Sequence, residues 1–305
     1  MSAQPHPHHR LALGLALATV VVWGGNFTLQ KHLLHLLEPS GFLLLRYLIT
    51  AVAALLLLRL SGGRWWPQLS RSELGQMLWL GVLGHTLHVG VVVHGVHLST
   101  PFSSAILLAS GPLFTLLLLR WQRAERLQPA QLIGVLLALL GMLMFLSDKL
   151  LGGQWRAGGG DLVLLMASIF YSVYTVQAQP VMLRHGALTT MGCSTLLGSL
   201  PLIAWTLPTA GNVPWQALTG LDWLGLWWAV LVSGFGGWLA WGWINTQLGV
   251  ARTAPLLYLI PPVAGVFAWA LMGEHYSWIK LLGALVILLG VALAQYAAVW
   301  LARWR

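Results

Sequence analysis

The most constraining feature of the sequence is a series of apolar runs, each about as long as a bilayer is thick. The hydrocarbon core is about 30 Å thick, and about 20 helical residues cross it. Strand-like alternation is absent, so the runs predict an all-α polytopic membrane protein rather than a β-barrel. The ten runs span approximately 11–30, 40–60, 74–97, 101–121, 128–147, 159–178, 187–207, 222–245, 251–272 and 278–301.

Composition agrees with lipid as the main solvent. Hydrophobic residues make up 58% of the chain and charged residues only 8%, whereas a soluble domain is about a quarter charged. The net charge of +9 is attributed to membrane orientation, so no nucleic-acid partner is expected. Cys193 is the single cysteine and can form no intramolecular disulfide. The first run lacks a small-residue cleavage site, so no cleavable signal peptide is expected.

Loop charges predict the orientation of the chain. Ten helices place both termini on one side, and that side carries eleven of the 16 Lys and Arg residues. These eleven are Arg10, Arg59, Arg64, Arg71, Arg120, Arg123, Arg126, Arg184, Arg252, Arg303 and Arg305. Only Lys31, Lys149, Arg156 and Lys280 fall on the other side, and Arg46 lies within a run. Because cytoplasmic loops are enriched in Lys and Arg, both termini are expected in the cytoplasm.

One segment occurs twice, at residues 112–141 and 261–290. At an offset of 149 residues, a Pro, a Glu and two Gly recur in one register, which is more informative than matching leucines. The pairs are Pro112 with Pro261, Glu125 with Glu274, Gly134 with Gly283 and Gly141 with Gly290. We interpret this as an internal duplication of about half the protein.

The duplication predicts an inverted-topology repeat. Each half has five helices, an odd number, so equivalent helices run in opposite directions, as in many secondary transporters. The first repeat is expected at 1–147, an external linker at 148–158 and the second repeat at 159–305. The alternative is a duplication that only makes a stable bundle.

Several motifs resemble a known family. The sequence W-G-G-N-F at 23–27, then Pro39 and the Arg46-Tyr47 pair, is similar to the first helix pair of the drug/metabolite transporter superfamily, EamA type. The repeated segment resembles that family's most recognisable part. The resemblance implies export of small metabolites or toxic organic compounds across a bacterial inner membrane, through a central cavity lined by several helices. One departure is that the second half has no counterpart of Arg46.

Prolines and glycines mark the repeated helices. Pro112, Pro261 and Pro262 fall near the middle of their runs, where each removes a backbone donor and predicts a helix kink. Such kinks are tolerated beside protein or a water-filled cavity, so the prolines either flank a central cavity or are simply packed. The Gly residues form small-residue stripes that predict close helix packing. Glu125 and Glu274 are expected to tie short loops.

Few ionisable residues fall within the runs. All seven acids lie at helix ends or in loops, so no intramembrane carboxylate is available for proton coupling. Arg46 should have partners because its burial costs about 2.5–3.5 kcal/mol. It is either structural or an anion site.

Three histidines complete the intramembrane set: His85, His88 and His94. His85 and His88 share a face at helical spacing and titrate near neutral pH, so they are candidates for proton coupling. The alternative is a neutral His bonded to a carbonyl. Two histidines without a third ligand predict no metal site.

Most of the 18 Trp residues fall near helix ends, as in an aromatic belt. A deeper set combines aromatic surfaces with a few polar tips, as small-molecule sites do. The predicted substrate-binding residues are Trp23, Asn26, Tyr171, Tyr174, Trp238, Trp241, Asn245 and Tyr258.

We therefore predict a secondary transporter that exports small amphipathic metabolites, such as amino acids. A nucleotide-binding G-x-x-x-x-G-K-[ST] loop is absent, so no ATP dependence and no cofactor are expected. The expected partners are a small-molecule substrate and the lipid bilayer. A lipid-carrier or sugar-phosphate translocator is an alternative that would favour a more basic cavity. An enzyme is not expected, because an intramembrane hydrolase using Ser233 would need a nearby base and lacks the G-x-S-x-G elbow.

Overall fold

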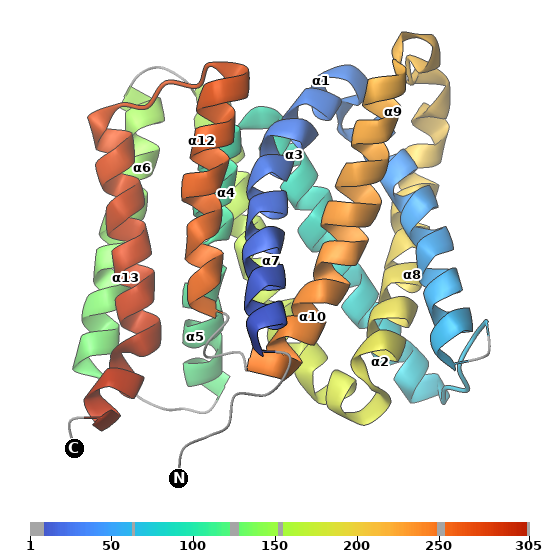
Figure 1. Cartoon of the computed structure of the whole chain (residues 1–305), viewed down its shortest axis with the longest axis horizontal. Coiled ribbons are helices and arrows are strands. Elements are labelled where there is room, and N and C mark those ends of the chain that lie inside the picture. Colours follow the sequence, from blue (N-terminus) through green and yellow to red (C-terminus); the bar gives the residue numbers. More distant parts are fainter. Residues whose placement is uncertain (1–8, 63–64, 123–127, 152–154, 249–253, 304–305) are drawn as a thin grey trace.

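The computed structural model describes residues 9–62, 65–122, 128–151, 155–248 and 254–303. Within these ranges the regular elements are helices, and no strand occurs (Figure 1). The π- and 3₁₀-helices are labelled η. In chain order the elements are α1 (His9–Gly62), α2 (Arg71–Gly81), η1 (Val82–Val89), α3 (Gly90–Leu98), α4 (Pro101–Leu108), α5 (Gly111–Gln122), α6 (Pro129–Leu151), α7 (Trp155–His185), α8 (Ala187–Thr206), η2 (Leu207–Asn212), η3 (Trp215–Ala217), α9 (Gly220–Trp227), η4 (Trp228–Gly236), α10 (Gly237–Leu248), η5 (Ala254–Leu259), α12 (Ile260–Met272) and α13 (Trp278–Arg303).

Helix α1 turns back on itself at Glu38. Its 54 residues would extend roughly 81 Å if straight, more than twice the apolar core of a bilayer. Glu38 leaves the helical conformation at φ 55°, ψ 164°, and Pro39 follows. Proline disfavours the α conformation in the residue before it. The helix therefore has two arms, residues 9–37 and 39–62, that meet at one end of the molecule (Figure 1).

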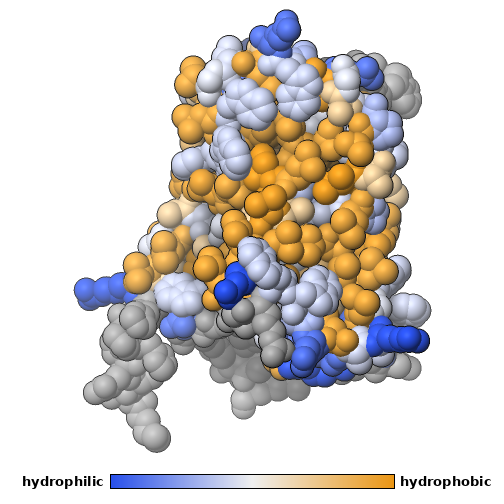
Figure 2. All heavy atoms as spheres, turned by 90° about the vertical axis from the view of Figure 1, so that its right-hand side faces the viewer, coloured by the Kyte–Doolittle hydropathy of each residue, from blue (hydrophilic) through white to orange (hydrophobic). Residues whose placement is uncertain are grey.

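The outer surface of the helices is apolar. Seven helical segments in the described residues are long and apolar enough to cross a membrane, and two shorter apolar helices cover Leu256–Met272 and Trp278–Ala294. Many leucines face outward, including Leu136 and Leu143 in α6. Figure 2 shows a broad hydrophobic band on one side of the molecule, with hydrophilic residues above and below it. These features make the chain a multi-pass membrane protein.

The two ends of the bundle can be named from the chain. Helix α1 begins and α13 ends at the same end, the lower one in Figure 1, which we call the terminal face. The turn of α1 at Glu38 lies at the other end, which we call the opposite face.

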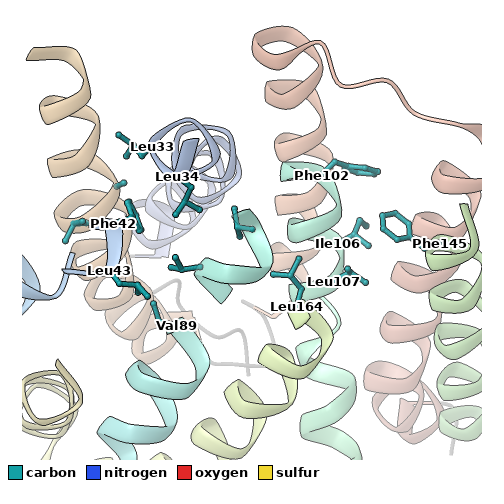
Figure 3. Packing of buried hydrophobic residues seen from close by; sticks show 14 of the residues in the cluster. Leu33, Leu34, Phe42, Leu43, Val89, Phe102, Ile106, Leu107, Phe145 and Leu164 are labelled. Carbon is teal, nitrogen blue, oxygen red and sulfur yellow. The ribbon is translucent and has the colours of Figure 1, made fainter. Parts of the chain in front are cut away.

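The largest core cluster joins both arms of α1 with α3, α4, α6, α7 and α13. Figure 3 shows Ile106 of α4 lying between Phe145 of α6 and Leu164 of α7, with Phe102 of α4 above it. These four side chains are at most 6% exposed. The apolar interior therefore extends across the bundle.

Helices α6 and α13 pack closely along the predicted glycine stripes. A Cβ atom on Gly134 would lie 2.3 Å from the Ala294 nitrogen, and one on Gly290 would lie 2.3 Å from the Ala138 nitrogen. Gly141 and Gly283 meet in the same way, since a Cβ on Gly283 would lie 3.1 Å from the Gly141 carbonyl. The prediction of close packing at these small residues is confirmed.

The prolines of the repeated segment lie where a run is interrupted. Pro112 is the second residue of α5, directly after the break between α4 and α5. Pro261 and Pro262 occupy the first turn of α12, after the 3₁₀-helix η5. Serines of α7 donate to carbonyls at the first break, Ser168 to Leu107 at 2.9 Å and Ser172 to Gly111 at 2.9 Å. The break beside Pro112 is therefore packed against protein.

Glu274 joins segments at the opposite face. Its carboxylate accepts a hydrogen bond from Lys280 Nζ at 2.8 Å and one from the Phe102 backbone at 3.4 Å. Lys280 is 5% exposed and lies 5.4 Å from the centre of the Tyr276 ring. The predicted loop-tying role of Glu274 is confirmed, whereas Lys280 is buried rather than a loop charge. Glu125 lies outside the described residues.

Candidate functional site

Two apolar helices widen into π-helices near their middle. These are η1, between α2 and α3, and η4, between α9 and α10. At the 149-residue sequence offset, residues 82–89 correspond to 231–238, which overlap η4. π-Helices are rare and often mark functional sites. The surroundings of η1 and η4 are therefore the candidate site.

Side chains from η1, α7 and α10 meet in one group, which we call the aromatic cluster. It consists of His85, His88, Tyr171, Tyr174 and Trp238. The Trp238 ring centre lies 6.0 Å from that of Tyr171, 6.2 Å from Tyr174 and 6.3 Å from His85. The rings of His88 and Tyr171 are 5.1 Å apart. Such tilted and edge-on pairs are favourable arrangements of aromatic rings.

Gly84 allows this cluster to form. A Cβ atom on Gly84 would lie 2.8 Å from the ring of Tyr174. Only a residue without a side chain lets η1 approach α7 so closely at this point. The sequence of η1 thus places its histidines beside the tyrosines of α7.

The two histidines have different partners. His85 Nε2 lies 3.0 Å from the Thr195 hydroxyl. His88 Nδ1 lies 3.0 Å from the carbonyl oxygen of Ala167, and because a carbonyl can only accept, this nitrogen carries the hydrogen. The expectation of a shared face assumed α-helical spacing, whereas both residues lie in a π-helix with a wider turn.

Trp23 and Trp241 form a second group beside η4. The Trp23 indole donates a hydrogen bond to the Ser233 carbonyl at 2.8 Å, and its ring lies 5.3 Å from that of Trp241. Gly237 leaves room for this contact, since a Cβ there would lie 2.5 Å from the indole nitrogen. The first arm of α1 is thereby held against η4 and α10.

The other predicted site residues lie elsewhere or are not described. Asn26 lies in the first arm of α1, and its buried Oδ1 has no hydrogen-bond partner in the described part of the chain. Tyr258, in η5, packs against the largest core cluster. The Asn245 side chain lies outside the described residues. His94 Nδ1 donates to the Gly90 carbonyl oxygen at 2.8 Å, within its own helix, and its ring lies 5.8 Å from that of Trp205.

Arg46 lies in the second arm of α1 and reaches η4. A Cβ atom on Gly234 would lie 3.6 Å from Nη2 of Arg46. The guanidinium is within electrostatic range of Tyr47, His85 and His88. Among the described residues it forms no hydrogen bond and no ion pair, although partners were expected from the sequence.

Two residues next to the predicted set also belong to this site. The Tyr47 hydroxyl donates to the His85 carbonyl at 3.2 Å, and Thr195 contacts the His85 ring. Tyr47 adjoins Arg46 in the motif that suggested the family, so its sequence position was a signal. Thr195 stands in an uncharged stretch without any distinguishing pattern.

The opposite face is joined by polar contacts from α1. His32 lies 3.0 Å from Asp222 of α9, and His97 lies 3.5 Å from Glu38 at the turn of α1. Lys31 donates to the carbonyls of Val96 and His97 at the end of α3. Helix α1 is thus tied to α3 and α9 at this face.

A groove of about 370 Å³ opens nearer the terminal face. It lies between α2, α7 and the end of α5. Leu80 and Val181 in its lining belong to the same core cluster as Tyr174. Its polar lining includes Gln177, which accepts from the Trp79 indole at 2.6 Å.

The described residues contain no group of three or more His, Cys, Asp or Glu that could hold a metal ion. The side chains that the structure brings together at the candidate site offer aromatic rings, imidazole and hydroxyl groups, and the guanidinium of Arg46.

Comparisons with known proteins agree with a transporter. Over 299 residues the chain is 27% identical to a protein of Escherichia coli (strain K12) named "Probable amino-acid metabolite efflux pump", and 95% of each chain is covered. It is 29% identical over 194 residues to a protein of Streptantibioticus cattleyicolor named "Probable terminal-alkyne amino-acid exporter", with 63% of each covered. A solved crystal structure shares the fold, with a TM-score of 0.60 at 19% identity, covering 94% of this chain and 98% of that one.

The model of the EamA-like transporter family matches residues 10–147 and again residues 158–296. The two matches together cover most of the chain, and they confirm the resemblance noted in the sequence. The chain belongs to the EamA-like transporter family.

Proposed function

We propose that this protein is a secondary transporter that exports small amphipathic metabolites, amino acids or related compounds, by alternating access. The names of the relatives, an amino-acid metabolite efflux pump and an amino-acid exporter, support this substrate class. The family and these names favour a transporter over an enzyme.

The position of the aromatic cluster carries the proposal. His85 and His88 come from the first segment matched by the family model, whereas Tyr171, Tyr174 and Trp238 come from the second. Transporters built from repeats bind substrate where the two repeats meet, near the middle of the membrane. An aromatic wall with a few polar groups is the usual lining of a small-molecule site. Trp23 and Trp241 extend this wall toward α1.

The architecture that we propose has ten membrane crossings. The two arms of α1 count as two, the six other long segments add six, and the two shorter apolar helices complete the ten. We assign 1–147 and 159–305 to two inverted five-helix repeats joined at 148–158. The reciprocal glycine contacts between α6 and α13, equivalent helices in the two repeats, support this pairing. The excess of Lys and Arg toward the terminal face supports cytoplasmic termini in a bacterial inner membrane.

Alternating access would then move the two repeats about the aromatic cluster. The polar contacts of α1 with α3 and α9 would close the opposite face, and the groove at the terminal face would be the side from which substrate approaches. His85 and His88 are our candidates for proton coupling. The competing role for His88 is that of a neutral donor to the Ala167 carbonyl.

A binding and transport experiment tests the proposal. The purified protein is screened by thermal unfolding against amino acids, quaternary amines, nucleobases and sugar phosphates. A ligand at 100 times its dissociation constant stabilises the folded state by about 2.7 kcal/mol. Stabilising compounds are then followed in proteoliposomes.

The variant Trp238→Leu should lose transport of the stabilising compound. Trp269→Leu is the matched control, because Trp269 is 62% exposed on α12. Equal transport by both variants would place the site elsewhere. Stabilisation by sugar phosphates alone would favour the translocator alternative.

A further inference from the structure

Arg46 brings a permanent positive charge to the candidate site. Its guanidinium lies against Gly234 of η4 and within electrostatic range of His85 and His88. An Arg side chain stays protonated in proteins and offers five N–H donors. The described acids inside or beside the bundle have other neighbours: Asp161 accepts from Ser99, Asp222 faces His32 and Glu274 pairs with Lys280. In the described part of the structure, no carboxylate therefore balances this charge.

The neighbours of Arg46 already have hydrogen-bond partners. The Tyr47 hydroxyl donates to the His85 carbonyl, the His85 ring contacts Thr195, and His88 donates to Ala167. Among the described residues the guanidinium itself forms no hydrogen bond, so its donors remain available for a ligand. Charges that are largely removed from water are usually paired, and Arg46 is only partly exposed, so an available guanidinium beside an aromatic wall calls for an anionic partner.

We propose that Arg46 binds the carboxylate of the transported compound while its apolar part lies against the aromatic cluster. This inference rests on the proposed function and narrows its substrate class to small organic acids and amino acids with a free carboxylate. The planar guanidinium matches a carboxylate through two parallel hydrogen bonds. A single negative charge on the substrate would balance the single positive charge of the site.

A phosphate would be matched less well, because it carries more charge than Arg46 alone balances. The described lysines are engaged at the opposite face. Lys31 donates to the carbonyls of Val96 and His97, and Lys280 pairs with Glu274. The site thus has one strong cation, which favours a monocarboxylate.

The experiment compares related ligands with and without a free carboxylate. The probes are phenylalanine, 3-phenylpropanoate, phenylalanine methyl ester and phenethylamine, with leucine as an aliphatic acid and inorganic phosphate as the competing anion. Thermal unfolding and proteoliposome export are measured for each. We expect the three carboxylates to raise the midpoint of unfolding, and the ester, the amine and phosphate to have little effect.

Two variants of Arg46 test the assignment. Arg46→Gln should weaken carboxylate binding by about 10- to 100-fold, the range for a lost hydrogen bond to a charged group. Arg46→Lys keeps the charge but not the paired donors, and it should bind carboxylates with intermediate affinity. If both variants fail to fold, the comparison of acid with ester in the unaltered protein decides.

The outcomes separate this inference from the proposed function. Equal stabilisation by phenylalanine and its methyl ester, no stabilisation by any carboxylate, or unchanged binding in Arg46→Gln would each overturn the carboxylate site. Export of esters or amines by the unaltered protein would then leave the transporter proposal intact. Binding of carboxylates without export of any compound would instead contradict the transporter proposal.

Discussion

Replacement of Gly290 by Ala should destabilise the contact between α6 and α13. The new Cβ would lie 2.3 Å from the Ala138 nitrogen, against the 3.4 Å at which ordinary van der Waals contact begins, a shortfall of about 1.1 Å. The Ala138 Cα and the Gly134 carbonyl, both at 2.8 Å, are also backbone atoms and cannot rotate away. The helices must therefore move apart and lose contacts along their length.

The magnitude follows from two opposing effects. Replacement of a helical Gly by Ala is by itself favourable by about 0.5–1 kcal/mol. Overpacking of a tight contact costs about 1–3 kcal/mol. Gly14→Ala is the matched control, because nothing lies within 4 Å of a Cβ at Gly14 in α1. The free energy of unfolding of Gly290→Ala should thus be about 1–3 kcal/mol below that of the control.

The assay is thermal or denaturant unfolding of the purified variants in one detergent. Gly134→Ala should behave like Gly290→Ala, because its Cβ would meet Ala294 at 2.3 Å. The double variant should lose less than the sum of the two losses, because helices already separated accept the second methyl group more easily. A Gly290→Ala variant as stable as the Gly14→Ala control would refute the close packing.

Three further predictions concern buried polar contacts. Lys280→Met should lower the free energy of unfolding by about 3–5 kcal/mol, because it leaves the Glu274 carboxylate, 10% exposed, without its cation. In thermal unfolding, the double variant with Glu274→Gln should recover part of this loss, and no recovery would contradict the pairing. Tyr47→Phe removes the donor to the His85 carbonyl and should lower the free energy of unfolding by about 1 kcal/mol. Amide hydrogen exchange of residues 82–89 should become faster, and unchanged exchange would argue against this hydrogen bond. Replacement of both His85 and His88 by Gln should abolish the pH dependence of transport, whereas an unchanged pH profile in proteoliposomes would exclude them as proton-coupling groups.

The helical fold could be predicted from the sequence because lipid requires backbone groups to be satisfied within each segment. Apolar runs, prolines and glycine stripes indicate where helices cross the membrane, where they are interrupted and where they pack closely. The close contact at Gly134 and Gly290 could likewise be expected, since small residues at helical spacing have few other uses in a membrane. The position of the turn in α1 was predicted only approximately, because the first arm continues to residue 37, whereas the first apolar run was expected to end near residue 30.

The candidate site was predicted less completely. The tyrosines of α7 and Trp238 of α10 could be chosen as aromatic residues away from the ends of the apolar runs, and they do meet. The π-helical conformation around His85 and His88 could not be predicted, because hydrophobic periodicity does not reveal a wider turn. The burial of Lys280 was also missed, since its neighbours come from separate parts of the chain: Phe102 of α4, Phe145 of α6, and Glu274 and Tyr276 of the loop before α13.

The two π-helices share one structural arrangement with α1. In η1, the His85 carbonyl accepts a hydrogen bond from Tyr47 in the second arm, and in η4, the Ser233 carbonyl accepts one from Trp23 in the first arm. A wider turn weakens the regular α-helical hydrogen bonding, and an aromatic donor from α1 supports a carbonyl in each case. Arg46 precedes Tyr47 in the second arm, and its guanidinium lies beside Gly234, the residue after Ser233. Helix α1 therefore couples both π-helices to the charge at the candidate site. An anion bound at Arg46 would therefore act on η1 and η4. Because the backbone hydrogen bonds of these two π-helices are already irregular, a movement between the repeats would disrupt the fewest regular hydrogen bonds there.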